Sequence, residues 1–296
     1  MTNNVLMPHL WFDKDAIEPV NFYISIFENS RITKHKKLSG TPTGDMDLLG
    51  FDLWGSPFMA MNAGPLFKFN PAISFFVYCG SEEKIDRLYA QLSEGGKVMM
   101  PLDKYDWTSK YAWVQDKYGV SWQLDIDDIK TEQKIVPALM FANEKSALVK
   151  EATSIYTSVF PDSRVLMEYP YPPAFNMPEG SILFSQIKIN GNIMNCMGSH
   201  RPQDFDFNES ISFIISCDDQ EDIDHYWNGL TANGGKESYC GWLKDPFGVS
   251  WQVTPAQMNE IMDGPDKAAS QRAFEAMMQM RKFDLAALLK AYAGGH

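Results

Sequence analysis

The sequence predicts an α+β protein made of four β-α-β-β-β modules, two in each of two tandem copies, with a helical C-terminal tail. The first observation behind this prediction is a duplicated segment, because Gly119-Val-Ser-Trp-Gln123 recurs about 130 residues later as Gly248-Val-Ser-Trp-Gln252. The second is that other segments also match, in the same order in both copies. These pairs are 22–32 with 155–165, 73–79 with 211–217, and 85–97 with 223–236.

The third observation is that the strand and helix patterns of one copy occur twice within it. Residues 5–12 alternate as a strand does, and Asp13 or Asp15 can cap a helix over about 14–28. A strand beginning at Ile32, a polar loop over 37–47, and a hairpin of strands 48–54 and 57–61 follow. The order then repeats as strand 72–78, helix 81–93, a strand near 97–100, and strands 111–116 and 119–124.

These patterns divide the chain into two domains, 1–128 and 129–260, and a helical extension over 261–296. A short polar linker over about 125–135 joins the two copies. In the extension, Asp266 and Asp284 can each cap a helix, and Gly294-Gly295 can end the second one. We expect this extension to pack on the duplicated core.

Composition and charge exclude several classes of partner. The formal net charge of −12 argues against nucleic acid and against anionic membranes. No apolar run approaches the ~20 residues that span a bilayer, and the N-terminal residues lack a signal-peptide pattern. The four cysteines form no Cys-x-x-Cys pair, which predicts free thiols in a reducing cytoplasm. We expect a monomer or homodimer that binds a small molecule.

Three motifs carry a resemblance to a known family. They are Met7-Pro-His-Leu-Trp-Phe12, the pattern Phe-Tyr-x-Ser-x-Phe-x-x-Ser-Arg over 22–31, and Asp-x-x-Gly-Val-Ser-Trp-Gln, which occurs twice. Over residues 5–255 the chain resembles the PhnB-like branch, often labelled demethylubiquinone methyltransferase-like, of the glyoxalase/bleomycin resistance/dioxygenase (vicinal oxygen chelate) superfamily. The resemblance implies that the modules pair into two glyoxalase-like half-barrels, each with a cleft.

The resemblance also implies where a divalent metal such as Zn, Ni, Mn or Fe would bind, since many members hold one in the cleft. Carried onto this chain, the ligand positions are His9, Ala72, Ala138 and Ser210 on first strands, Gln123 and Gln252 on last strands, and positions near Ala60 and Cys196. Paired as in dimeric glyoxalases, one cleft receives His9 and Gln252, and the other receives Ala138, Cys196 and Gln123. Neither set supplies the three His, Cys or carboxylate ligands of catalytic zinc, and His9 with Gln252 is the better candidate for a weak metal site.

Each candidate residue also has a structural interpretation. His9 is the candidate catalytic residue, although it could equally be a hydrogen-bonded histidine in a half-buried strand. Trp11, Gln123, Cys196 and Gln252 are the candidate pocket residues. The alternative is that Trp11 belongs to the core and that each glutamine ties two strands together. The paired aspartates of the repeated motif are interpreted as turn residues.

Two functions remain open. One is an enzyme of lyase/isomerase or dioxygenase type that acts on a small metabolite, with His9 or a weakly bound metal as its chemical group. The other is a non-catalytic binding or sequestration protein of bleomycin-resistance type. Methyl transfer is not expected, because no strand, Gly-rich turn and helix form a nucleotide-cofactor site. The loops differ most between the copies, at 36–47 against 166–181 and at 102–110, which predicts that the two clefts bind different molecules or that only one binds.

Overall fold

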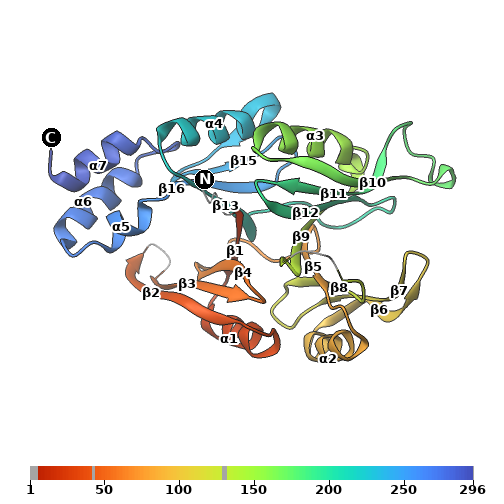
Figure 1. Ribbon diagram of the computed structural model, residues 1–296. Helices are drawn as coiled ribbons and strands as arrows, with labels where there is room; N and C mark the ends of the chain where they lie inside the picture. Colours follow the sequence, from red (N-terminus) through yellow and green to blue (C-terminus); the bar gives the residue numbers. More distant parts are fainter. Residues whose placement is uncertain (1–5, 42–43, 129–131, 296) are drawn as a thin grey trace. The chain divides into compact units, whose positions relative to one another are not determined.

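The computed structural model describes residues 6–41, 44–128 and 132–295. The chain forms two compact units. The larger unit comprises residues 8–157 and 162–211, and the smaller comprises residues 1–7, 158–161 and 212–296. Figure 1 shows the elements along the chain.

The first module has the predicted order of strands and helix. Its elements are β1 (Leu6–Phe12), α1 (Ile17–Ile26), β2 (Arg31–Thr41), β3 (Gly44–Leu53) and β4 (Ser56–Asn62), and its strands lie in the order β1-β4-β3-β2. Ala16 is the N-cap residue of α1, and the preceding Asp15 stabilises the start of the helix, because its Oδ1 accepts hydrogen bonds from the backbone N–H groups of Ile17 at 2.7 Å and Glu18 at 3.3 Å.

The predicted polar loop over 37–47 is wrong. Strands β2 and β3 run through this segment, and Lys37 lies opposite Asp47 in their antiparallel register. Lys37 Nζ also lies 3.2 Å from Asp45 Oδ2. Opposite charges on facing strands stabilise this hairpin. The segment was predicted to be a loop because its own composition is polar.

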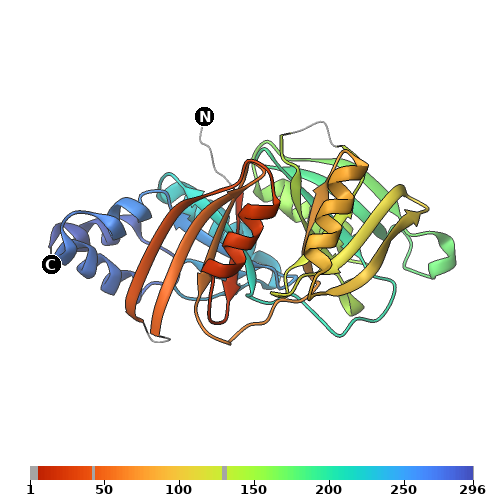
Figure 2. The same ribbon diagram turned by 90° about the horizontal axis from the view of Figure 1, so that it is seen from below.

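The second and third modules form one eight-stranded sheet within the larger unit, in the order β10-β11-β12-β9-β5-β8-β7-β6. Figure 2 shows α2 lying across the strands of its module. The predicted helix over 81–93 is α2, and Ser81 caps it, since its side chain accepts a hydrogen bond from Lys84 N at 3.4 Å. The elements are β5 (Ile73–Tyr78), α2 (Glu82–Ser93), β6 (Lys97–Tyr105), β7 (Thr108–Gln115), β8 (Ser121–Asp125), β9 (Ile135–Phe141), α3 (Val149–Val159), β10 (Arg164–Pro170), β11 (Ile182–Ile189) and β12 (Asn192–Gly198).

The fourth module and the tail make up most of the smaller unit. The strands lie in the order β14-β15-β16-β13. Asp266 Oδ1 accepts from Ala269 N at 3.0 Å and Asp284 Oδ1 from Ala287 N at 2.9 Å, so both predicted helix caps are confirmed. A short helix, α5, precedes these two helices and was not predicted. The elements are β13 (Ile211–Cys217), α4 (Gln220–Thr231), β14 (Lys236–Glu237), β15 (Trp242–Lys244), β16 (Ser250–Pro255), α5 (Met258–Asp263), α6 (Lys267–Met277) and α7 (Leu285–Ala293).

The core of the larger unit lies between the helices and one face of the strands. Trp122 on β8 is fully buried, and its ring centroid lies 5.3 Å from those of Tyr23 and Phe27 at α1 and of Phe75 on β5. The predicted alternation of β8 is therefore confirmed, with Trp122 toward the helices and Gln123 on the opposite face. The α+β fold of β-α-β-β-β modules with C-terminal helices is confirmed as well.

Candidate functional site

The repeated Asp-x-x-Gly-Val-Ser-Trp motif is a structural turn. Asp116 accepts hydrogen bonds from Tyr23 Oη, Trp122 Nε1 and the backbone N–H groups of Tyr118 and Val120, all between 2.8 and 3.0 Å. Gly119 completes the turn with a φ of +94°, a conformation that glycine adopts without strain. Burial raises the pKa of the Asp116 carboxyl, while the hydrogen bonds from Trp122 and Tyr23 lower it. These hydrogen bonds occupy both oxygens of the Asp116 carboxylate, which confirms the interpretation of Asp116 as a turn residue.

The second copy of the turn, in the smaller unit, has the same geometry. Asp245 accepts from Trp251 Nε1 at 2.9 Å and from the backbone N–H groups of Phe247 and Val249 at 2.9 and 3.0 Å. Gly248 has a φ of +93°. The repeated motif therefore stabilises the fold and does not form the candidate functional site.

The site candidate lies on the other face of the eight-stranded sheet, which we call the inner face. Strand alternation places Ser74, Phe76 and Tyr78 of β5 on this face. An apolar and aromatic cluster covers it. The buried members are Phe76, Tyr78, Tyr111, Val136, Ala138, Met140, Ile193 and Met197, and the partly buried residues Met100, Tyr105, Trp113, Phe184 and Phe205 pack against them.

The centre of the inner face is a small residue with polar neighbours. Ala138 on β9 lies opposite Ser74 of β5 and opposite Asn195 of β12 in the strand registers. Gln123 of β8 reaches the same place, because its Nε2 donates to Ser74 Oγ at 2.7 Å. All four residues are buried. The centre of this face therefore holds alanine, serine, asparagine and glutamine, whereas Ala72, the expected ligand position of the second module, immediately precedes β5.

Two hydrogen-bonded networks satisfy the buried amides, as burial requires. In the first, Tyr111 Oη donates to Gln123 Oε1, and Gln123 donates to Ser74. In the second, Gln186 Nε2 donates to Asn195 Oδ1 at 3.0 Å, and both amides donate to Tyr78 Oη at 3.3 Å. Each network has a tyrosine at one end, so the polar groups of the inner face are held in fixed positions.

The tyrosines of the inner face are neutral phenols at physiological pH. Burial raises the pKa of Tyr78 to about 12, and burial also holds the pKa of Tyr111 well above its usual value. Asp125 at the end of β8 contributes a further upward shift to both. Asp125 itself accepts from Thr108 Oγ1 at 2.9 Å, and burial raises its pKa. Neither tyrosine therefore has a pKa near neutrality, which a general base would need.

A long hairpin borders the inner face. Strands β6 and β7 turn at Asp106, and the rings of Tyr105 and Trp107 beside it stack with centroids 5.0 Å apart. Both rings also meet Tyr111 edge-on at 5.6 Å. Trp107 is 60% exposed, which is unusual for a tryptophan in a monomer and typical of a binding surface.

The structure places the predicted pocket residue Gln123 on the inner face. Cys196 lies one residue away from the expected position, because it pairs with Leu139 while Asn195 pairs with Ala138. Strand alternation therefore turns the buried Cys196 toward the other face. Asn195, Tyr78 and Gln186 are inner-face residues that the sequence reasoning missed. The only available signal was their period-two spacing within their strands.

His9 and Trp11 lie on β1 of the larger unit. His9 is buried opposite Met59, where Ala60 was expected, and burial lowers the pKa of its imidazole to about 4. Trp11 Nε1 donates to Gly64 O at 2.9 Å, and its ring meets Phe67 edge-on at 5.1 Å. These contacts favour the structural interpretation of Trp11.

Gln252 lies on β16 of the smaller unit, where its Nε2 donates to Ser212 Oγ at 2.9 Å. The same bond joins Gln123 to Ser74, so the glutamine–serine pair is duplicated along with the turn. His9 and Gln252 belong to different units, and their joint role as metal ligands stays a prediction.

The residues at the centre of the inner face do not fit a divalent metal. Catalytic zinc takes His, Cys or carboxylate ligands, whereas the four positions here are apolar or neutral. Over residues 6–41, 44–128 and 132–295, no group of three or more His, Cys, Asp or Glu side chains is arranged to hold a metal ion. All four cysteines are free thiols, as predicted. No described helix is long and apolar enough to cross a membrane.

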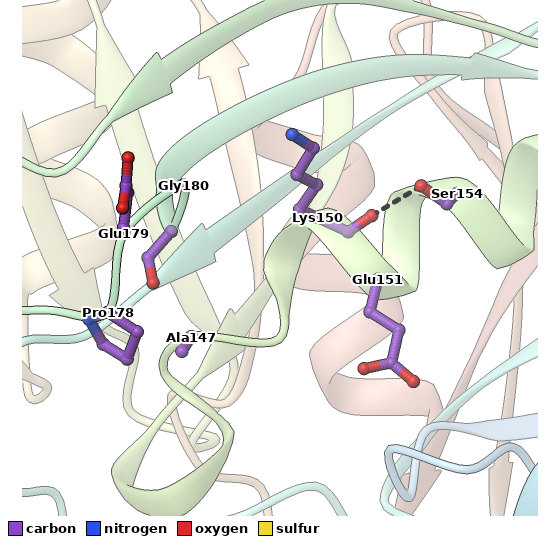
Figure 3. Close-up of a pocket in the computed structure, with 8 residues that line it drawn as sticks. Ala147, Lys150, Glu151, Ser154, Pro178, Glu179 and Gly180 are labelled. Carbon is purple, nitrogen blue, oxygen red and sulfur yellow. Dashed lines mark hydrogen bonds between the residues drawn. The ribbon is translucent and has the colours of Figure 1, made fainter.

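A shallow groove of about 380 Å³ lies elsewhere on the larger unit, between α3 and the segment before β11 (Figure 3). Lys150 and Glu151 from α3 and Glu179 from the segment give it mixed charge. Ser154 Oγ donates to Lys150 O within the helix at 2.8 Å. The groove thus lacks a consistent charge or a set of converging polar groups, and we assign it no role.

The repeated β-α-β-β-β modules define a protein of the glyoxalase fold class. The sequence model of the family described as 3-demethylubiquinone-9 3-methyltransferase matches residues 4–125 and again residues 133–254. The chain therefore belongs to this family, in two tandem copies, and the resemblance to PhnB-like proteins is confirmed. No curated protein matches the chain significantly.

Three solved structures are similar to the chain, and the last two of them support the fold. A putative 3-demethylubiquinone-9 3-methyltransferase, PhnB protein, from Bacillus cereus is 35% identical, covers 40% of this chain and 96% of its own, and has a TM-score of 0.38. Glyoxalase I from Zea mays is 10% identical over 83% of this chain and 90% of its own, with a TM-score of 0.57. A putative dioxygenase from Bacillus subtilis is 11% identical over 96% of this chain and 92% of its own, with a TM-score of 0.50. At such identities the last two similarities establish the fold alone.

Proposed function

We propose that the protein binds a small, largely apolar molecule at the inner face of the second and third modules, without a metal ion. One observation carries the proposal. Ala138, Ser74, Asn195 and Gln123 meet at the centre of this face, where the superfamily resemblance implies metal ligands, and an aromatic cluster surrounds them. A site lined by apolar and aromatic side chains with a few fixed polar groups is typical of small-molecule binding.

The border of the inner face supports the same proposal. The β6–β7 hairpin carries the exposed Trp107 and the partly buried Tyr105, which can cover a planar molecule. The corresponding strands of the fourth module, β14 and β15, span only Lys236–Glu237 and Trp242–Lys244. The hairpin has therefore been lengthened or retained in one copy alone, as expected if that copy has its own ligand.

Binding is tested by titrating the full chain with neutral aromatic compounds and following tryptophan fluorescence, with and without EDTA. We expect saturable binding that EDTA leaves unchanged. The variant Ala138→Leu adds bulk at the centre of the inner face and should weaken binding at least tenfold. Ala147→Leu makes the same change beside the groove of α3 and should leave binding unchanged. Binding that disappears on chelation, or that Ala138→Leu does not affect, would contradict the proposal.

A second candidate function is a reaction at His9. The observation that favours it is the pKa of about 4, which leaves the buried imidazole neutral at physiological pH, the form that ligates a metal. Bound divalent metal is measured in purified protein and in the His9→Ala variant. Metal retained by the unaltered chain and lost from the variant would support this candidate. Near-zero metal in both would remove its metal-dependent form.

Methyl transfer, which the family description names, is not part of the proposal. The turn from β5 to α2 is Cys79-Gly80-Ser81, with a single glycine, and does not have the Gly-rich form that holds a nucleotide cofactor. The glycines Gly95 and Gly96 follow the end of α2 and do not begin a helix. Measurement of methyl transfer from a labelled donor by the purified chain would test this exclusion.

A further inference from the structure

The second network leaves one hydroxyl hydrogen unused. Tyr78 Oη accepts from both Gln186 Nε2 and Asn195 Nδ2 at 3.3 Å. Among the described residues, no acceptor receives the Tyr78 hydrogen, and Tyr78 is only 7% exposed. A phenol carries one donor and accepts through its lone pairs, so two bonds to the oxygen leave the hydrogen directed elsewhere. An unused donor at a buried position is costly unless another group accepts from it.

The first network leaves a similar donor. Ser74 Oγ accepts from Gln123 Nε2 at 2.7 Å, and its own hydrogen has no acceptor in the part of the chain that the structure describes. By contrast, the Tyr111 hydroxyl donates to Gln123 Oε1 and is fully used. Two unused hydroxyl donors therefore belong to the inner face, on the same side of β5.

Both donors flank the smallest side chain of the inner face. Ser74 is the register partner of Ala138 on one side, and Asn195, which binds Tyr78 Oη, is its partner on the other. Phe76 lies between Ser74 and Tyr78 along β5, and its ring stacks on that of Tyr78 with a centroid separation of 5.9 Å. Around Ala138 the inner face thus offers donors, an aromatic surface and little side-chain volume.

The charge of this region disfavours an anion. Asp125 at the end of β8 is 6% exposed and raises the pKa of both Tyr78 and Tyr111 by its negative charge. Asp127 raises the pKa of Tyr78 in the same way, which adds a second acidic side chain to this region. Burying a carboxylate beside such a group without a cation is strongly unfavourable.

We propose that the ligand of the inner face is an uncharged, flat aromatic molecule with a hydrogen-bond-accepting oxygen, such as an aryl ketone, and that the Tyr78 hydroxyl donates to this oxygen, with Ser74 as a second donor further along the same strand. The ring of the ligand then packs on Phe76 and on the partly buried aromatics at the border. This inference rests on the proposed binding function and adds the chemical class of the ligand.

Three matched probes test the class on the unaltered full chain. 2-Acetylnaphthalene has the acceptor, 2-ethylnaphthalene has the same shape without it, and 2-naphthoate carries a negative charge. Because a buried hydrogen bond is worth about 1.4 kcal/mol, we expect the ketone to bind about tenfold more tightly than the hydrocarbon. The naphthoate should bind most weakly of the three. Isothermal titration and tryptophan fluorescence give the dissociation constants.

Variants then identify the donor. Tyr78→Phe should lower the affinity for the ketone to that for the hydrocarbon and leave the hydrocarbon unchanged. Tyr171→Phe removes a hydroxyl from another buried tyrosine, outside the inner-face cluster, and should preserve the tenfold preference. Ser74→Ala is the second variant and should reduce the preference in the same direction.

The outcomes separate this inference from the proposed function. Saturable binding of ketone and hydrocarbon with equal affinity would overturn the assignment of the ligand class and leave the binding function standing. A preference that survives in both Tyr78→Phe and Ser74→Ala would overturn the assignment of the donors. If none of the three probes binds, the proposed function fails and this inference fails with it.

Discussion

The two copies have the same structure at the turn of the repeated Asp-x-x-Gly-Val-Ser-Trp motif, and they differ at the hairpin that precedes it. Asp116 and Asp245 bind the indole N–H of Trp122 and Trp251 at 2.8 and 2.9 Å, and the following glutamines bind equivalent serines. The hairpins, however, consist of β6 and β7 with nine and eight residues in one copy, and of β14 and β15 with two and three residues in the other.

This difference separates what folds the modules from what they bind. The turn satisfies buried polar groups with local hydrogen bonds, so any change in it would cost stability in either copy. Within the hairpin, β7 supplies buried residues such as Tyr111, whereas β6 and the turn are largely exposed and are therefore free to change with the ligand. The first strands have diverged in a similar way, with His9 in one position and Ala138 in the equivalent one.

The largest expected effect is a loss of stability when the aspartate of the shared turn is replaced. Asp116→Ala leaves the Tyr23 hydroxyl, the Trp122 indole and two backbone N–H groups without their acceptor. We expect a loss of about 3–5 kcal/mol in the free energy of unfolding, and a loss of similar size for Asp245→Ala. Urea denaturation followed by circular dichroism measures both. A loss below about 1 kcal/mol in either variant would show that the two turns are not equivalent supports.

The next prediction concerns the effect of acid on the free energy of unfolding. It compares β1, which carries His9, with β9, which carries Ala138 at the equivalent position. The pKa of His9 is about 4 in the folded chain and about 6.5 when exposed, so the unfolded state binds the proton more tightly. The stability that the neutral, buried His9 contributes to the folded chain is fully present above pH 6.5, and it is lost as the pH falls toward 4. The loss amounts to about 3 kcal/mol over this range.

The matched variant for this prediction is His9→Ala, which places at β1 the residue that β9 carries at Ala138. Its stability should fall less between pH 6.5 and 4 than that of the unaltered chain, as measured by urea denaturation at each pH. Parallel pH profiles of the two proteins would show that His9 is not the group that titrates.

A smaller effect is expected from placing an acidic side chain at Gln123, where the superfamily resemblance implies a metal ligand. Gln123→Glu puts a carboxyl at a position that is 2% exposed and removes the donor to Ser74. We expect a loss of about 1–3 kcal/mol, because a buried amide is replaced by a group that must be desolvated. Gln252→Glu should cost less, since Gln252 is only half-buried. Thermal denaturation measures both variants.

The effect of zinc on the melting temperature is a more specific test of Gln123→Glu. Ala138, Ser74 and Asn195 still provide no charged ligand beside the new carboxyl, so we expect zinc to leave its melting temperature unchanged. A zinc-dependent rise of several degrees would mean that the inner face has kept a usable metal site.

The sequence was sufficient for most of the fold because the repeated motif obeys local rules. The spacing from Asp116 through Gly119 to Trp122 determines the turn, the positive φ and the capped indole within seven residues. Duplication then supplied the module order for the rest of the chain. The error at 37–47 arose because the stabilising charges lie on the opposite strand, so the segment by itself looks like a loop.

The inner face was less predictable because it depends on register between distant strands. Tyr78 binds Gln186 and Asn195, which lie 108 and 117 residues further along the chain. A shift of one residue turns a side chain to the other face, which is why Cys196 was expected where Asn195 lies. The unused hydroxyls of Tyr78 and Ser74 emerge only when the whole network is known.

The smallest effect on stability, and the most direct comparison of the two hairpins, comes from their exposed aromatics. Trp107 at the β6–β7 turn is 60% exposed, and Tyr239 between β14 and β15 is 56% exposed. Because neither side chain is in the core, Trp107→Ala and Tyr239→Ala should each change the free energy of unfolding by about 0.5 kcal/mol or less. Only Trp107 stacks on an aromatic that borders the inner face, so only its loss should weaken binding of 2-acetylnaphthalene, by about three- to tenfold. Equal binding by the two variants, measured by titration calorimetry, would mean that the longer hairpin does not serve the ligand. The difference between the copies would then need a cause other than binding at the inner face.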